Sequence, residues 1–152
     1  MSRVPFSVLF LGWLGLVPFV YAVAMIFSEP GTWPTFGFFD SSPEGGTHIL
    51  ERFGAVILGF MGGCLWGFAS AKDRAPSLVF LTATIVPAFI AFIAIQPDPA
   101  LSCVWLAFGF VILQGIDVVF QRAGVTPDYW LSLRLPLTAG VMTCLLVGAL
   151  HG

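Results

Sequence analysis

Long apolar runs separated by short polar stretches extend through this 152-residue chain. A membrane helix needs about 20 mostly apolar residues to cross a hydrocarbon layer of about 30 Å. Five runs meet this length, and they lie near residues 5–27, 49–70, 77–95, 100–121 and 129–150. The stretches between them are rich in residues that favour turns. The pattern therefore predicts an all-α fold, a single transmembrane helical bundle over residues 1–152 in which successive helices are antiparallel.

The composition excludes a water-soluble domain. Hydrophobic residues make up 58% of the chain and charged residues 9%, with a mean hydropathy of +0.97, whereas soluble domains carry about 25% charged residues. A net charge of −2 without a basic run gives no electrostatic footprint for nucleic acid. The cysteines, Cys64, Cys103 and Cys144, are far apart inside apolar runs and are interpreted as small buried hydrophobes.

Charges in the loops predict the orientation of the bundle, because basic loop residues mark the cytoplasmic side. The basic residues of the N-terminus and of the second and fourth loops are Arg3, Lys72, Arg74 and Arg122. The first and third loops carry only acidic charges, namely Glu29, Asp40, Glu44 and Asp98. The sequence thus predicts a cytoplasmic N-terminus and a C-terminal His151 on the outer side.

The first outer loop, residues 28–47, is long and aromatic. Between its prolines and glycines it carries Trp33, Phe36, Phe38 and Phe39. Aromatic side chains of this kind favour the membrane–water interface. We expect this loop to lie at the level of the lipid headgroups.

Small residues recur every four positions in the second predicted helix. They are Ala55, Gly59, Gly63, Gly67 and Ala71. On a helix they form one ridge, which resembles a glycine zipper and lets another helix backbone approach closely in lipid. Two interpretations remain open. The ridge packs within the chain, where Gly12 and Gly15 of the first helix offer a small surface, or it docks onto another membrane protein or a second copy.

Charged residues within spans are rare and are candidates for function. Asp117 and Arg134 lie at about equal distances from the loop that joins the last two predicted helices. They are therefore expected to pair between these two antiparallel helices. Gln114 lies one turn from Asp117 and could join the network. The pair is interpreted as a buried structural clamp. The alternative is a protonatable Asp117 in a conduction or substrate path.

A second polar group, His48, Glu51 and Arg52, stands at the outer end of the second helix. His48 and Glu51 are three residues apart and share a face, whereas Arg52 points elsewhere. We predict a polar cap at the outer interface, with Arg52 extending toward water. A metal or haem bridging His48 and His151 is geometrically conceivable, but the chain offers few further ligands. No metal or cofactor is therefore expected.

Three sequence blocks carry a family resemblance. Residues 11–19 follow the pattern L-G-x-x-G-L-x-P-F, and residues 53–67 follow aromatic-G-A-x-x-L-x-F-x-G-G-x-x-W-G. The third block, at the last helix, consists of Pro127, Tyr129, Trp130, Leu133, Arg134 and Thr138. The order resembles the transmembrane protein 69-like family, bacterial and mitochondrial membrane proteins of unassigned function. The resemblance implies an inner membrane, bacterial or mitochondrial, and no particular chemistry.

The chain departs from the family pattern at two places. Leu65 occupies the position before Trp66 where the family usually has Arg or His, and the first outer loop is longer than usual. The small-residue ridge, the very short cytoplasmic loops and the lack of a reactive constellation favour a non-enzymatic accessory, assembly or structural component. We expect it in a bacterial inner membrane or, as the second choice, in a mitochondrial one. Its expected partners are lipid and other membrane proteins or itself, through the ridge. The alternative is a small transporter or channel that uses Asp117, as a homo-oligomer.

Overall fold

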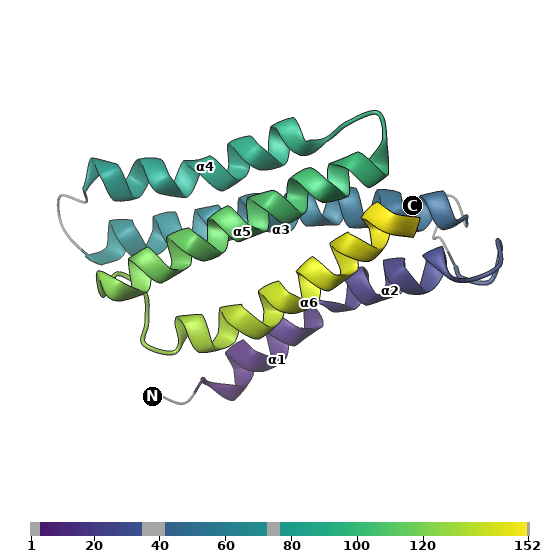
Figure 1. The fold of residues 1–152 in the computed structure, drawn as a ribbon. Coiled ribbons are helices and arrows are strands. Elements are labelled where there is room, and N and C mark those ends of the chain that lie inside the picture. The colour runs from purple at the N-terminus through teal and green to yellow at the C-terminus, as the bar shows by residue number, and fades with distance from the viewer. Residues whose placement is uncertain (1–3, 35–41, 73–76, 152) are drawn as a thin grey trace.

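The computed structural model describes residues 4–34, 42–72 and 77–151. Its elements are α1 (Phe6–Leu14), α2 (Val17–Ile26), α3 (Pro43–Lys72), α4 (Leu78–Ala94), α5 (Pro99–Arg122) and α6 (Trp130–His151). The described residues contain no strand. Figure 1 shows long helices that run side by side and alternate in direction. The prediction of an all-α bundle is confirmed.

The helices are long enough for a multi-pass membrane protein. Four apolar segments of the described residues have the length and hydropathy of membrane spans: Phe6–Ile26, Pro43–Ala71, Pro99–Arg122 and Trp130–His151. The fifth, α4, has 17 residues, which is the lower limit for a span. Five predicted spans thus correspond to helical segments that can cross a bilayer.

The first span, predicted over residues 5–27, is interrupted close to Pro18. It consists of α1 and α2, joined at Gly15 and Leu16. Pro18 explains the break, since a proline ring clashes with the carbonyl four residues earlier, which here belongs to Leu14. α1 ends at that residue.

The second span begins earlier than predicted, at Pro43 instead of residue 49. Ser42 caps the helix, because its Oγ accepts a hydrogen bond from the backbone N–H of Gly45 at 3.1 Å. Proline is also favoured in the first turn, where its missing N–H is not needed. The pair Gly45 and Gly46 therefore belongs to a helix and not to the predicted loop, which is correspondingly shorter.

Part of that loop lies outside the described residues, including Phe36, Phe38, Phe39 and Asp40. Its first residues fold back on α2. The indole N–H of Trp33 donates to Ser28 Oγ at 2.8 Å, and its ring packs edge-on against Tyr21, with 5.5 Å between ring centroids.

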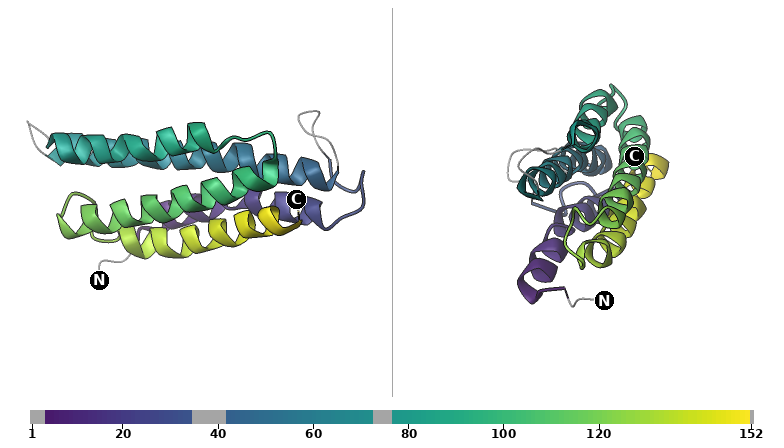
Figure 2. Two further views of the ribbon diagram at one scale, coloured as in Figure 1. Left: turned by 45° about the horizontal axis from the view of Figure 1, so that its top comes forward. Right: turned by 90° about the vertical axis from the view of Figure 1, so that its left-hand side faces the viewer.

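α3 is the central helix and contacts α2, α4, α5 and α6. Figure 2 shows α3 and α4 running together, with α5 and α6 as a second pair. Glycines allow the closest approaches. A Cβ at Gly46 would lie 2.6 Å from the carbonyl oxygen of Ala22 in α2, and one at Gly62 would lie 2.6 Å from that of Thr84 in α4. These glycines hold the neighbouring backbones in contact with α3.

α1 lies at the edge of the bundle (Figures 1 and 2), packed mainly against α6. None of its nine residues, all of which the structure describes, is buried. Its exposed side chains include Phe6, Phe10 and Leu11. Since these side chains are apolar, α1 suits a position in contact with lipid.

Candidate functional site

A buried polar group near the α5–α6 turn joins α5 to α6. Arg134 Nε donates to Asp117 Oδ2 at 3.1 Å, and Trp130 Nε1 donates to Asp117 Oδ1 at 2.6 Å. Asp117 is 0% exposed and Arg134 is 4% exposed. Both carboxylate oxygens therefore accept a hydrogen bond, and the charge of Asp117 is balanced inside the bundle. We call this group the α5–α6 clamp: Asp117, Trp130 and Arg134.

A tight turn brings the two sides of the clamp together. The N–H of Val125 donates to the carbonyl of Phe120 at 2.9 Å, and the N–H of Gly124 donates to that of Gln121 at 3.0 Å. This is the hydrogen-bond pattern of a Schellman motif. Gly124 has a φ of +63°, a conformation that glycine adopts without steric strain. The chain therefore reverses within a few residues and sets α6 beside α5.

Gln114 does not join the clamp, so that part of the predicted network is wrong. Its side-chain nitrogen and oxygen are buried without a hydrogen-bond partner among the described residues. The two oxygens of Asp117 already accept from Trp130 and Arg134. In α6, Arg134 Nη2 and Thr138 Oγ1 are also buried without a hydrogen-bond partner among the described residues.

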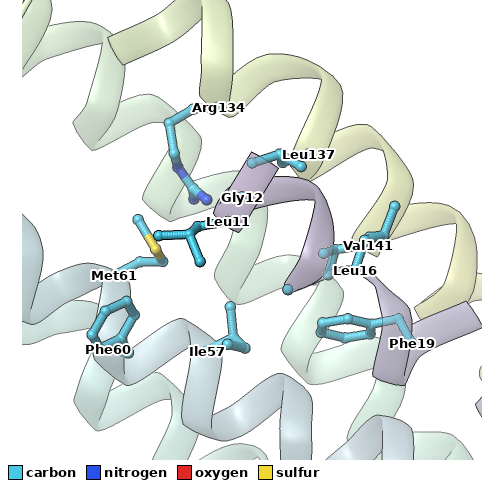
Figure 3. A pocket seen from close by; sticks show the side chains of 11 residues that line it. Leu11, Gly12, Leu16, Phe19, Ile57, Phe60, Met61, Arg134, Leu137 and Val141 are labelled. Carbon is cyan, nitrogen blue, oxygen red and sulfur yellow. The ribbon is translucent and has the colours of Figure 1, made fainter. Parts of the chain in front are cut away.

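A small pocket lies next to the clamp. Its volume is about 140 Å³, and it is lined by α1, the α1–α2 junction, α2, α3 and α6. Figure 3 shows Arg134 extending from α6 toward Leu11 and Gly12 of α1, with Ile57 and Met61 of α3 on the opposite wall. Arg134 thus binds Asp117 on one side and borders this mostly apolar pocket on the other.

A second polar network connects α3 to α5 at the other end of the bundle. Ser102 Oγ donates to Glu51 Oε1 at 2.7 Å, and His48 Nδ1 lies 3.1 Å from Glu51 Oε2. Ser102 Oγ also accepts from the backbone N–H of Gln96 at 2.8 Å. Glu51 is 4% exposed, so its carboxylate is buried between α3 and α5. The side chain of Arg52 is exposed.

The chain matches the family model described as a protein of unknown function (DUF3429) over residues 4–150. This protein belongs to the DUF3429 family. Transmembrane protein 69 of Xenopus tropicalis is 30% identical over 154 residues, which cover 99% of this chain and 56% of that relative. The chain thus spans little more than half of the relative's length. No solved structure matches. The resemblance to the transmembrane protein 69-like family is confirmed, and it assigns no activity.

Two hydrogen-bond donors of this DUF3429 protein were not predicted from its sequence. Trp130 was not linked to Asp117, although it stands four residues before Arg134 and therefore shares its helix face. Ser102 was not linked to Glu51, because the two are 51 residues apart. The first omission had a signal in the helical spacing. The second depended on how α3 and α5 pack.

The described residues contain no group of three or more His, Cys, Asp or Glu side chains that could hold a metal ion. The ring of His151 lies beside Phe27, with 5.2 Å between ring centroids. His48 instead contacts Glu51. His48 and His151, the two residues that a bridging metal would need, therefore each contact another side chain.

The small-residue ridge of α3 is largely open. A Cβ at Gly59 would lie 4.0 Å from Ala88 Cα in α4, whereas one at Gly63 or Gly67 would meet no described atom within 4 Å. Ala55 is half-buried and Ala71 is exposed. The suggested partner surface on the first helix is wrong. Its Gly12 approaches α6 instead, where a Cβ would lie 2.9 Å from Leu137 Cδ1.

Proposed function

We propose that this protein is a non-enzymatic accessory or assembly component that binds another integral membrane protein through the open face of α3. The open face is formed by Gly63 and Gly67 with the neighbouring Val56, Phe60 and Trp66. The observation that carries this proposal is the empty space at Gly63 and Gly67. Other glycines of the same helix, Gly46 and Gly62, are pressed against neighbouring backbones.

The chemistry of this face favours a helix as its partner. Apolar surface does not drive association in lipid, so membrane helices associate where small residues permit close backbone contact. Val56, Phe60 and Trp66 are exposed around the glycines. A partner helix could approach at Gly63 and Gly67 while these larger side chains pack on both sides of it.

The alternative of a conduit through Asp117 receives less support from the geometry. A path residue must be reached by water or substrate, whereas Asp117 is fully buried and binds Trp130 and Arg134. This arrangement supports a structural role for the α5–α6 clamp. The family resemblance supports an inner membrane, bacterial or mitochondrial, as the place of action.

The proposal is tested by extracting the native membrane with a mild detergent and identifying the proteins that co-migrate with this chain. We expect stoichiometric co-migration with another membrane protein, and its loss in Gly63→Leu. Gly115→Leu is the matched control, because a Cβ at this exposed glycine of α5 also meets no described atom within 4 Å. Migration as a monomer, or as copies of this chain alone, would contradict the proposal. Unchanged co-migration of Gly63→Leu would contradict the role of this face.

A further inference from the structure

The pocket beside the α5–α6 clamp is lined on one side by Arg134, whose guanidinium is not fully paired. Arg134 uses Nε for Asp117, while its Nη2 is buried without a partner among the described residues. Leaving such a donor unpaired in an apolar interior is unfavourable. Arg134 also lines the pocket, and Figure 3 shows its side chain directed toward Leu11 and Gly12. The site is therefore suited to an acceptor from outside the chain.

Water alone is a poor occupant of this pocket. A buried water is usually held by two to four polar partners. Among the described residues that line the pocket, Arg134 carries the only polar side chain, and the others are apolar or glycine. A molecule with one acceptor and an otherwise apolar body satisfies this surface better.

Charge decides between an anionic and a neutral ligand. Asp117 already balances the guanidinium of Arg134, and the two residues are almost completely buried. An anion in the pocket would leave one uncompensated negative charge in the interior, which is strongly unfavourable. A carbonyl oxygen accepts the same hydrogen bond without adding a charge.

The size and position of the pocket favour the end of a lipid-like molecule. A volume of about 140 Å³ corresponds to roughly five water molecules at about 30 Å³ each. This accommodates a ring or an ester group but not a whole lipid. Leu11, on the α1 wall, is 64% exposed, so an attached tail could continue along α1 into the bilayer.

We infer that the pocket between α1, α3 and α6 binds the carbonyl group of a neutral, tailed lipid, with the guanidinium of Arg134 as the hydrogen-bond donor. The carbonyl belongs either to a quinone ring or to a glycerolipid ester. Phe60 belongs both to this pocket and to the open face of α3, but lipid binding here does not depend on the proposed docking function.

The test uses the full-length protein purified in an alkyl maltoside, a detergent without a carbonyl group. A photoreactive benzoquinone with an alkyl tail and a photoreactive diacylglycerol are the two probes. We expect one of them to label peptides of α1, α3 or α6, and an excess of its unlabelled form to prevent the labelling. The probe that succeeds identifies the source of the carbonyl.

Two variants test the role of the pocket. Gly15→Leu adds a side chain at the pocket wall, and Gly15 has a φ of −63° that any residue adopts. Arg134→Lys keeps a positive charge for Asp117 but lacks the planar fork that offers a second donor. We expect each to weaken probe binding about tenfold or more. For Arg134→Lys this is the loss that fits one hydrogen bond to a charged donor, whereas Gly15→Leu occupies the space that the ligand needs. Gly115→Leu, on the exposed face of α5, leaves binding unchanged.

Three results would overturn the inference. One is the absence of competable labelling by both probes in the folded wild-type protein. Another is equal labelling of the wild type and Gly15→Leu. The third is competition by a fatty-acid carboxylate but by neither neutral lipid, because it would show that the site selects an anion. Gly15→Leu also keeps the test valid if Arg134→Lys fails to fold.

Discussion

At the scale of single residues, the clamp shows how a charge is tolerated inside an apolar bundle. Removing one member of a buried ion pair leaves the other charge uncompensated, which typically destabilises a protein by about 3–5 kcal/mol. We therefore expect Arg134→Ala to lower the free energy of unfolding by an amount in this range. Unfolding with sodium dodecyl sulfate in mixed micelles measures it. The double variant Asp117→Ala with Arg134→Ala should be less destabilised than either single variant. Additive losses would contradict the pairing.

Ser102 stabilises a second buried carboxylate, at the other end of the bundle. Its hydroxyl donates to the buried carboxylate of Glu51, so Ser102→Ala removes a donor that crosses from α5 to α3. The expected loss in the free energy of unfolding is about 1–3 kcal/mol. Thr82→Ala is the control, because the exposed Thr82 hydroxyl donates only to its own helix, at Leu78. The same loss in both variants would show that Glu51 does not depend on Ser102.

At the scale of helices, two adjacent glycines of α3 have opposite surroundings. A Cβ at Gly62 would lie 2.6 Å from the Thr84 carbonyl oxygen, whereas one at Gly63 would meet no described atom within 4 Å. Gly62→Ala must separate α3 from α4, and overpacking of this kind typically destabilises by about 1–3 kcal/mol. Gly63→Ala should leave the free energy of unfolding unchanged or raise it, since alanine favours a helix. Equal effects in detergent would contradict this packing of α3 against α4.

The helices also show what the sequence could and could not predict. The spans followed from the length of the apolar runs, since the bilayer fixes the number of residues that cross it. Their breaks were harder to place. α1 ends four residues before Pro18, yet α4 continues through Pro87 and α6 through Pro136. Neighbouring helices and local adjustments decide whether a membrane helix tolerates proline, and a single sequence does not contain this information.

The same limit applies to the candidate sites. The pairing of Asp117 with Arg134 was predictable, because a short loop places both at equal depth on neighbouring helices. The isolation of Gln114 and the burial of Glu51 depend on which helix face turns inward. Likewise, spacing identified the ridge with Gly63 but did not show that Gly62 faces α4.

At the scale of the whole molecule, the bundle has two chemically different ends. Figure 1 places the start of α1, the end of α3, the start of α4 and the α5–α6 turn at one end, and the C-terminus at the other. Two of the basic residues assigned to the inner side, Lys72 and Arg122, are the last residues of α3 and α5 and stand at the first end. The other two, Arg3 and Arg74, lie outside the described residues. The asymmetry of the charges therefore follows the alternation of the helices.

This asymmetry predicts the orientation in the membrane, since basic loops stay in the cytoplasm. Two exposed positions, Ser77 before α4 and Pro97 before α5, stand at opposite ends. In sealed vesicles, a membrane-impermeant maleimide should label Ser77→Cys only when the vesicles are inside-out, and Pro97→Cys only when they are right-side-out. The native cysteines lie within α3, α5 and α6, and the unsubstituted protein measures their background. Labelling in the reverse sense would place the N-terminus outside, and labelling of both variants from one side would contradict a membrane-spanning α4.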